Sequence, residues 1–214
     1  MAAATEKLAA LRHLLAERFP TVPRTAGRLL PTGLAAIDES TGGLPLSAIT
    51  EIVCDTPSCG GHLLFGQLLA ITRRERQRVA LIDSTDSFDP ASYPDDLLTH
   101  LVWIRCRDTT TALHATDLLA RDANFSLLLL DLRDAPAADL RRIPGPQWYR
   151  LQRAVEPTDL ALVVETPRPS VPSAQLRLML ETSHSPSAFD RERSTLIETL
   201  PVTLQRQRLQ SATG

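Results

Sequence analysis

The 214-residue chain has almost no lysine and no excess of positive charge. Only Lys7 is a lysine among its 23 basic residues, and 25 acidic residues outnumber these, which leaves a net charge of −2. Proteins that bind duplex DNA usually carry a clear basic balance or a basic stripe, because the release of counterions drives their affinity. The charge balance therefore argues against strong direct binding to DNA.

Cysteine is also scarce. The three cysteines, Cys54, Cys59 and Cys106, do not make the disulfide framework of a small secreted protein. No second cysteine or histidine pair at ligand spacing completes a metal site with Cys54 and Cys59. The apolar runs are too short to span a bilayer, and the N-terminus lacks a signal-peptide layout. We therefore expect a cytoplasmic protein with no bound metal.

What the chain does contain is a series of short apolar segments that alternate with helical ones. The predicted strands are 47–53, 79–83, 101–104, 127–131 and 160–164, and the predicted helices include 63–74, 109–121 and 146–155. Two segments of alternating polarity, 176–181 and 196–205, predict antiparallel strands at a sheet edge. This order predicts an α/β fold, in which a mostly parallel twisted sheet has helices on both faces.

The N-terminal residues predict an amphipathic helix. Leu8, Leu11 and Leu15 fall on one stripe at spacings of three and four residues, and Pro20 ends the segment. An isolated helix of this length is marginal in water. The stripe therefore needs a surface, either on its own domain or on a neighbouring protein.

A strand, a glycine-containing loop and an apolar helix form the setting of a phosphate-binding loop, whose motif is G-x-x-x-x-G-K-[ST]. Here the lysine position falls on Gly60 or Gly61, and the Ser/Thr position on Gly61 or His62. The first glycine is replaced by Cys54 or Asp55. The lysine and the hydroxyl normally hold the phosphates and Mg²⁺. The degenerate motif therefore predicts no nucleotide cofactor and no enzymatic activity.

The first half of the chain resembles the bacterial RecA family. The matching blocks, in the family's order and spacing, are Pro31-Thr32-Gly33, Gly42-Gly43-Leu44-Pro45, Thr50-Glu51-Ile52-Val53 with its loop, and Leu81-Ile82-Asp83-Ser84-Thr85-Asp86. The resemblance implies a RecA-like core. It also places the family's catalytic glutamate at Thr85, which cannot act as a general base.

Other positions of the RecA family survive only in part. The resemblance implies that Asp83 and Asp131 are vestigial acids. In the family, the acid at the position of Asp131 supports a magnesium ion that the phosphates hold. A loop that binds no phosphate would bring no such ion. The family's sensor glutamine is replaced near Glu165-Thr166. The second DNA-binding loop corresponds to residues 167–175, a short segment with three prolines and one arginine. Proline fixes φ, so we expect a stiff loop and weak or absent DNA binding.

The second half of the chain is similar to the ImuA family of RecA-like proteins. The similarity rests on the run Pro-Arg-Pro-Ser-x-Pro-Ser-Ala-x-Leu-Arg-Leu at 167–178 and on an arginine-bearing C-terminus. It implies a non-catalytic accessory protein in SOS-induced translesion DNA synthesis. The implied partners are an inactive Y-family polymerase homologue (ImuB), an error-prone replicative-type polymerase and RecA.

Two other readings remain open. The SulA family of division inhibitors, which bind the tubulin-like FtsZ, shares the RecA-like core without a nucleotide, but matches Pro31–Pro45 poorly. A divergent RecA-like ATPase would need a cation from elsewhere, such as Arg73 or Arg74. Those arginines lie about ten residues into the predicted helix, far from its N-terminus at ~1.5 Å per residue.

The C-terminal segment is the predicted contact for the polymerase-like partner. Leu196 and Leu200 belong to a predicted edge strand that Pro201 marks, and edge strands offer unpaired backbone groups to a second chain. Arg206 and Arg208 can pair with acidic side chains. The predicted organisation is a helical arm over 1–24, a RecA-like domain over 25–204 and a flexible tail over 205–214.

Overall fold

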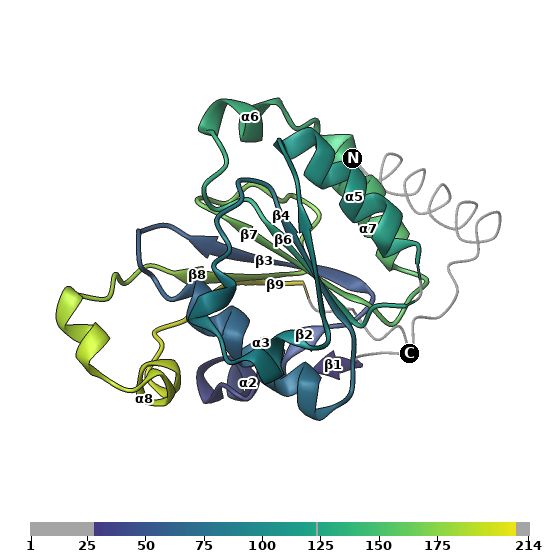
Figure 1. The fold of residues 1–214 in the computed structure, drawn as a ribbon. Helices are drawn as coiled ribbons and strands as arrows, with labels where there is room; N and C mark the ends of the chain where they lie inside the picture. The colour runs from purple at the N-terminus through teal and green to yellow at the C-terminus, as the bar shows by residue number, and fades with distance from the viewer. Residues whose placement is uncertain (1–27, 123, 209–214) are drawn as a thin grey trace, which may run out of the picture. The chain divides into compact units, whose positions relative to one another are not determined.

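The computed structural model describes residues 28–122 and 124–208, which are built around a seven-stranded sheet (Figure 1). The strand order is β5-β4-β6-β7-β3-β8-β9, with every neighbouring pair parallel except β8 and β9. The strands are β3 (Ala48–Cys54), β4 (Val79–Asp83), β5 (Leu101–Arg105), β6 (Leu127–Asp131), β7 (Ala161–Thr166), β8 (Leu176–Leu180) and β9 (Thr203–Gln207). This sheet confirms the predicted α/β fold and is consistent with a RecA-like core.

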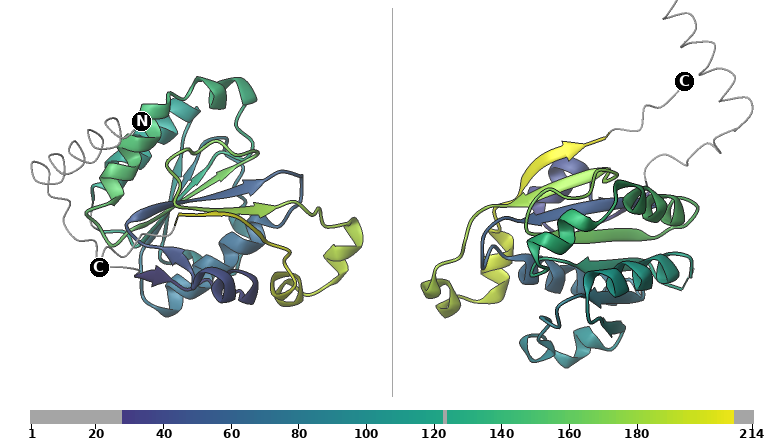
Figure 2. Two further views of the ribbon diagram at one scale, coloured as in Figure 1. Left: turned by 180° about the vertical axis from the view of Figure 1, so that it is seen from behind. Right: turned by 90° about the horizontal axis from the view of Figure 1, so that it is seen from above.

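Helices cover both faces of the sheet (Figures 1 and 2). One face carries α5 (Thr109–Ala120), α6 (Ala137–Arg142) and α7 (Gly145–Val155), and the other carries α3 (Gly61–Arg74). The short elements are β1 (Leu29–Leu30), α2 (Ala35–Thr41), β2 (Leu44–Pro45), η1 (Pro90–Ser92), α4 (Asp95–Leu98), η2 (Pro186–Asp190) and α8 (Arg193–Glu198). Within the described residues, no helix is long and apolar enough to cross a membrane.

The leucine run of β6 shows why the sheet is buried on both sides. Side chains alternate along a strand, so Leu127 and Leu129 pack under α3 whereas Leu128 and Leu130 pack under α5 and α7. All four are at most 1% exposed. Each fully buried leucine contributes roughly 1.5–3 kcal/mol. A strand that is apolar at every position therefore belongs at the centre of a parallel sheet.

The resemblance block Pro31-Thr32-Gly33 forms a turn that is closed by Asp38. The Asp38 carboxylate accepts hydrogen bonds from the Thr32 and Gly33 backbone N–H groups, at 3.0 and 2.8 Å, and from the Thr32 hydroxyl at 2.7 Å. Gly33 has φ +72°, and a Cβ there would meet Gln67 of α3 at 2.5 Å. The turn thus needs glycine both for its backbone and for its approach to α3.

The prediction of a strand over 196–205 is wrong in its first part. Leu196 lies in α8, and the strand begins only at Thr203. Leu196 and Leu200 are 8% and 3% exposed, because they pack inward onto the domain. Their alternation with polar residues fits a short amphipathic helix as well as a strand. β9 also continues to Gln207, past the predicted domain end at 204. The predicted arm with Leu8, Leu11 and Leu15 lies outside the described residues.

The segment 167–178 is folded around a buried carboxylate, that of Glu51 on β3. Glu51 is 0% exposed and accepts hydrogen bonds from the Ser170 and Val171 backbone N–H groups, at 2.6 and 3.0 Å. The Thr166 hydroxyl donates to it at 2.9 Å, and Arg177 Nε lies 2.6 Å from its other oxygen. A buried carboxylate is tolerated only when its oxygens are paired in this way. Glu51 therefore fixes the course of the segment.

Replacement of Glu51 should destabilise the fold strongly. In Glu51→Gln the shape is kept but Arg177 loses its ion-pair partner, and a broken buried pair costs about 3–5 kcal/mol. We expect the free energy of unfolding, measured by urea titration with circular dichroism, to fall by about 3 kcal/mol. The control Glu181→Gln changes an exposed side chain and should alter it by less than about 0.5 kcal/mol. Equal effects of the two substitutions would contradict this role of Glu51.

Candidate functional site

The candidate site is the edge of the sheet where the parallel strands end. Asp83, Asp131 and Glu165 stand opposite one another in register on β4, β6 and β7. They are 0%, 2% and 1% exposed. Next to them, β3 ends at Cys54 and leads through a loop into α3, which begins at Gly61. In open α/β sheets this edge is where ligands bind.

The loop between β3 and α3 contains two residues in the left-handed backbone region. Ser58 and Gly60 have φ +55° and +96°, so the chain turns sharply before the helix. Gly60 and Gly61, the two positions that could correspond to the lysine of the motif, have no side chain. At His62, where the family has a hydroxyl, the imidazole Nδ1 lies 3.4 Å from the Tyr93 Oη. Burial first, and then the charge of Arg133, lower the pKa of His62, so the ring is neutral at pH 7.

Arg133 brings a positive charge to the place that the missing lysine leaves open. A Cβ on Gly61 would lie 3.1 Å from Arg133 Nη1. Arg133 follows β6 by two residues, so its side chain returns over the end of the sheet. The guanidinium is held by Asp131: its Nε donates to Oδ1 at 3.0 Å, and its Nη2 donates to Oδ2. The sequence analysis did not predict this cation. The Asp-x-Arg spacing directly after a buried strand could have indicated that the arginine pairs with the aspartate.

Glu165 completes a buried cluster with Arg133 and Asp131. Its Oε2 lies 2.9 Å from Arg133 Nε, but neither Glu165 oxygen accepts a hydrogen bond of good geometry among the described residues. The Nε hydrogen is directed at Asp131 instead, so the contact between Arg133 and Glu165 is an ion pair without a hydrogen bond. Burial, only partly offset by Arg133, raises the pKa of Glu165 to about 7. Burial also opposes ionisation of Asp131, but hydrogen bonds and charge from Arg133 outweigh it and lower that pKa.

This cluster leaves the charge of Arg133 unavailable for a phosphate. The guanidinium is 13% exposed as a side chain and has two carboxylates as neighbours. A phosphate would have to displace Asp131 and would then lie beside two buried acids. Phosphate sites instead use cations that are free to pair with the ligand. The arrangement therefore favours a closed structural cluster over a nucleotide site.

Residues near the C-terminus also pack against the loop between β3 and α3. Leu200 packs on Gly60, where a Cβ would lie 2.4 Å from Leu200 Cδ1. The His184 N–H donates to the Ser58 carbonyl at 3.0 Å, and the Ser183 hydroxyl donates to the Pro57 carbonyl at 2.6 Å. Residues 183–200 thus occupy space next to the helix N-terminus, where phosphates bind in phosphate-binding loops.

The remaining positions singled out from the sequence have structural roles. Asp83 accepts hydrogen bonds from the Thr85, Ser87 and Phe88 backbone N–H groups, at 3.2, 3.1 and 3.0 Å. It therefore shapes its own turn. Thr85, at the family's catalytic position, is exposed. Arg73 and Arg74 pair with Asp96 and Glu75, and lie at the far end of α3.

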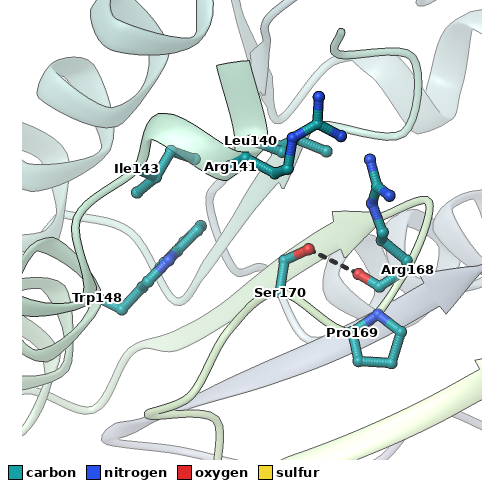
Figure 3. Close-up of a pocket in the computed structure, with 7 residues that line it drawn as sticks. All are labelled: Leu140, Arg141, Ile143, Trp148, Arg168, Pro169 and Ser170. Carbon is teal, nitrogen blue, oxygen red and sulfur yellow. Dashed lines mark hydrogen bonds between the residues drawn. The ribbon is translucent and has the colours of Figure 1, made fainter. Parts of the chain in front are cut away.

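A shallow pocket of about 260 Å³ lies beside the 167–175 segment. Arg141 and Arg168 both extend at its mouth (Figure 3), and neither has an acidic partner among residues 28–122 and 124–208. The pocket is lined by Leu140, Arg141, Ile143, Trp148, Arg168, Pro169 and Ser170. Two exposed guanidinium groups suit an anionic group.

The raised pKa of Glu165 predicts a measurable dependence on pH. An unfolded glutamate ionises near 4.3, so between that pH and about 7 the folded state binds the extra proton and loses stability as pH rises. Glu165→Gln removes this penalty. Relative to wild type, the variant should be more stable by on the order of 2–3 kcal/mol at pH 8, and by little at pH 4.

The comparison with wild type is needed because His62 and His100 have lowered pKa values and act in the opposite direction. Urea titrations at several pH values measure the difference directly. The exposed control Glu181→Gln should give a curve parallel to that of wild type. A difference between Glu165→Gln and wild type that is constant with pH would show that Glu165 has the same pKa in the folded and unfolded states, which would contradict the raised pKa.

Comparison with known proteins adds no identification. No protein-family profile matches the chain, and no curated protein matches it either. The fold and the geometry of this site therefore carry the functional conclusion, together with the motifs of the sequence.

Proposed function

We propose that this chain is a non-catalytic RecA-like protein that acts as an accessory protein in SOS-induced translesion DNA synthesis. The absence of catalysis in this proposal is supported by the buried cluster of Arg133, Asp131 and Glu165. The cation nearest the missing lysine is bound by Asp131 and lies beside Glu165, and the loop itself is covered by Leu200. A protein that keeps the RecA-like fold without its nucleotide acts through its surfaces.

The translesion part is supported by the ImuA-like segment at 167–178. In RecA-like proteins the corresponding loop contacts DNA, whereas here it is tied to Glu51 and stiffened by prolines. A loop fixed in this way favours a role as a scaffold. The expected partners are the Y-family polymerase homologue, the error-prone replicative-type polymerase and RecA.

The surface that best suits such a partner is β9. It is the last strand in the sheet order, and its residues are exposed apart from the half-buried Arg206. The outer side of β9 pairs with no other strand within the described residues. The Arg208 N–H still donates to the Gln175 carbonyl at 2.8 Å, so the strand pairing extends to residue 208. An exposed edge strand offers backbone groups to a partner strand.

This geometry revises the predicted contact residues. Leu196 and Leu200 are buried in their own domain, so the contact is proposed for β9 with Arg206 and Arg208. Arg206 Nη1 has one weak hydrogen bond, to the Pro172 carbonyl at 3.4 Å. It therefore has other N–H groups with which to pair to acidic side chains of a partner.

Charge reversal on β9 tests the proposal. The double variant Arg206→Glu with Arg208→Glu should weaken capture of the purified ImuB-like protein by about tenfold or more, since reversed charges repel an acidic partner surface. The control Arg74→Glu with Arg78→Glu changes two exposed arginines, one at the end of α3 and one just before β4, and should leave capture unchanged. Melting curves of both variants should remain close to wild type.

Surface plasmon resonance with the immobilised chain gives the affinities. FtsZ is injected over the same surface as a second ligand. Binding of FtsZ without binding of the polymerase-like protein would contradict the proposed function. Equal weakening by both double variants would instead contradict the assignment of the contact to β9.

A further inference from the structure

Two of the three cysteines lie together under the loop between β3 and α3. Cys54 is the last residue of β3 and Cys59 precedes Gly60, and they are 8% and 4% exposed. The Cys54 sulfur lies 3.1 Å from the position of a Cβ on Gly61, which is two residues after Cys59, so the two thiols are neighbours. All three cysteines are free thiols. The loop residues Asp55, Pro57 and Ser58 are exposed. The pair therefore lies directly beneath the surface, within reach of a small oxidant.

The two thiols have different surroundings, which shift their pKa values in opposite directions. Cys59 lies beside the Cys54 thiol, just before a 14-residue helix, and Arg133 is near. A hydrogen bond from Cys54, which outweighs burial, lowers the pKa of Cys59 to about 7. The pKa of Cys54 is raised, first because it donates this hydrogen bond and then because it is buried. Cys59 is thus the thiolate and Cys54 the thiol.

We propose that Cys54 and Cys59 form a reversible oxidation site, which hydrogen peroxide converts into an intramolecular disulfide. The Cys59 thiolate attacks one peroxide oxygen, the O–O bond breaks, and Cys59 becomes a sulfenic acid. The released hydroxide takes up the proton that Cys59 has lost and leaves as water. This first step oxidises one sulfur by two electrons.

The second step closes the disulfide. The Cys54 sulfur attacks the Cys59 sulfur, the S–O bond breaks, and the hydroxide that leaves takes the Cys54 proton. In sum, two thiols and one hydrogen peroxide give one disulfide and two waters. A dithiol reductant reverses the reaction by exchange. The product is a covalent ring over residues 54–59, directly beside Gly61 and Arg133.

Cys106 provides the internal control. It lies just after β5, where its backbone N–H donates to the Asp83 carbonyl at 2.8 Å. Burial, followed by the charges of Asp83 and Asp108, raises its pKa. It has no thiol neighbour among the described residues. Peroxide should therefore leave Cys106 reduced under conditions that oxidise the loop pair.

The experiment treats the full chain with hydrogen peroxide, unfolds it, and alkylates the remaining thiols. Mass spectrometry should show that alkylated sites fall from three to one, with Cys106 the labelled residue. Peptide mapping should place a disulfide between Cys54 and Cys59, and dithiothreitol should restore all sites. Retention of all three sites, oxidation of Cys106 at the same rate, or disulfides only between chains would overturn the proposal.

Variants test the order of the two steps. With Cys54→Ser, the sulfenic acid on Cys59 should persist and react with dimedone, whereas Cys59→Ser should leave Cys54 unmodified. Cys106→Ser should behave as wild type. A dimedone adduct on Cys54 but not on Cys59 would overturn the assigned roles. If a loop variant fails to fold, the mapping of the wild-type disulfide still decides whether the site exists.

Discussion

Arg133 joins two buried carboxylates at the sheet edge, and the character of the site depends on this ion pair. The guanidinium is bound to Asp131 and lies 2.9 Å from Glu165 Oε2. Removing one partner of a buried pair leaves an uncompensated charge, which typically costs about 3–5 kcal/mol. The cluster therefore stabilises the folded state, and a ligand that bound Arg133 would have to displace Asp131. The loop still turns sharply into α3, but the nearby charge of Arg133 is paired within the protein.

Other parts of the structure follow from the same constraint on buried charge. Glu51, on the central strand, is satisfied by two backbone N–H groups, a hydroxyl and Arg177. This pairing fixes the 167–178 segment, while Leu200 and residues 183–184 fix the loop before α3. The 167–178 segment and the loop before α3 are thus both held by local contacts. These fixed segments support our proposal of an accessory protein that does not hydrolyse ATP.

The sequence predicted the sheet well, because its central strands consist mostly of apolar residues in uninterrupted runs and its helices have regular spacing. It predicted the segment 196–205 poorly, since Leu196 and Leu200 fit a short helix as well as an edge strand. Leu200 packs on Gly60, which is 140 residues away in the sequence, so its burial could not be predicted from the local pattern. Arg133 was missed for a related reason. The degenerate motif showed that a lysine was absent, but only tertiary structure brings an arginine from the end of another strand to that place.

The measurement that tests the closed site most directly is a calorimetric titration of the full chain with ATP and Mg²⁺, in parallel with Arg133→Gln and the exposed control Arg78→Gln. If Arg133 is committed to Asp131 and the loop is covered, no protein in the set shows binding heat at micromolar to millimolar ATP. Losing a charge-assisted contact costs roughly 1.5–3 kcal/mol, so the divergent-ATPase reading makes a clear counter-prediction. Micromolar affinity in wild type and in Arg78→Gln, weakened at least about tenfold by Arg133→Gln, would show that Arg133 replaces the missing lysine and would contradict the account.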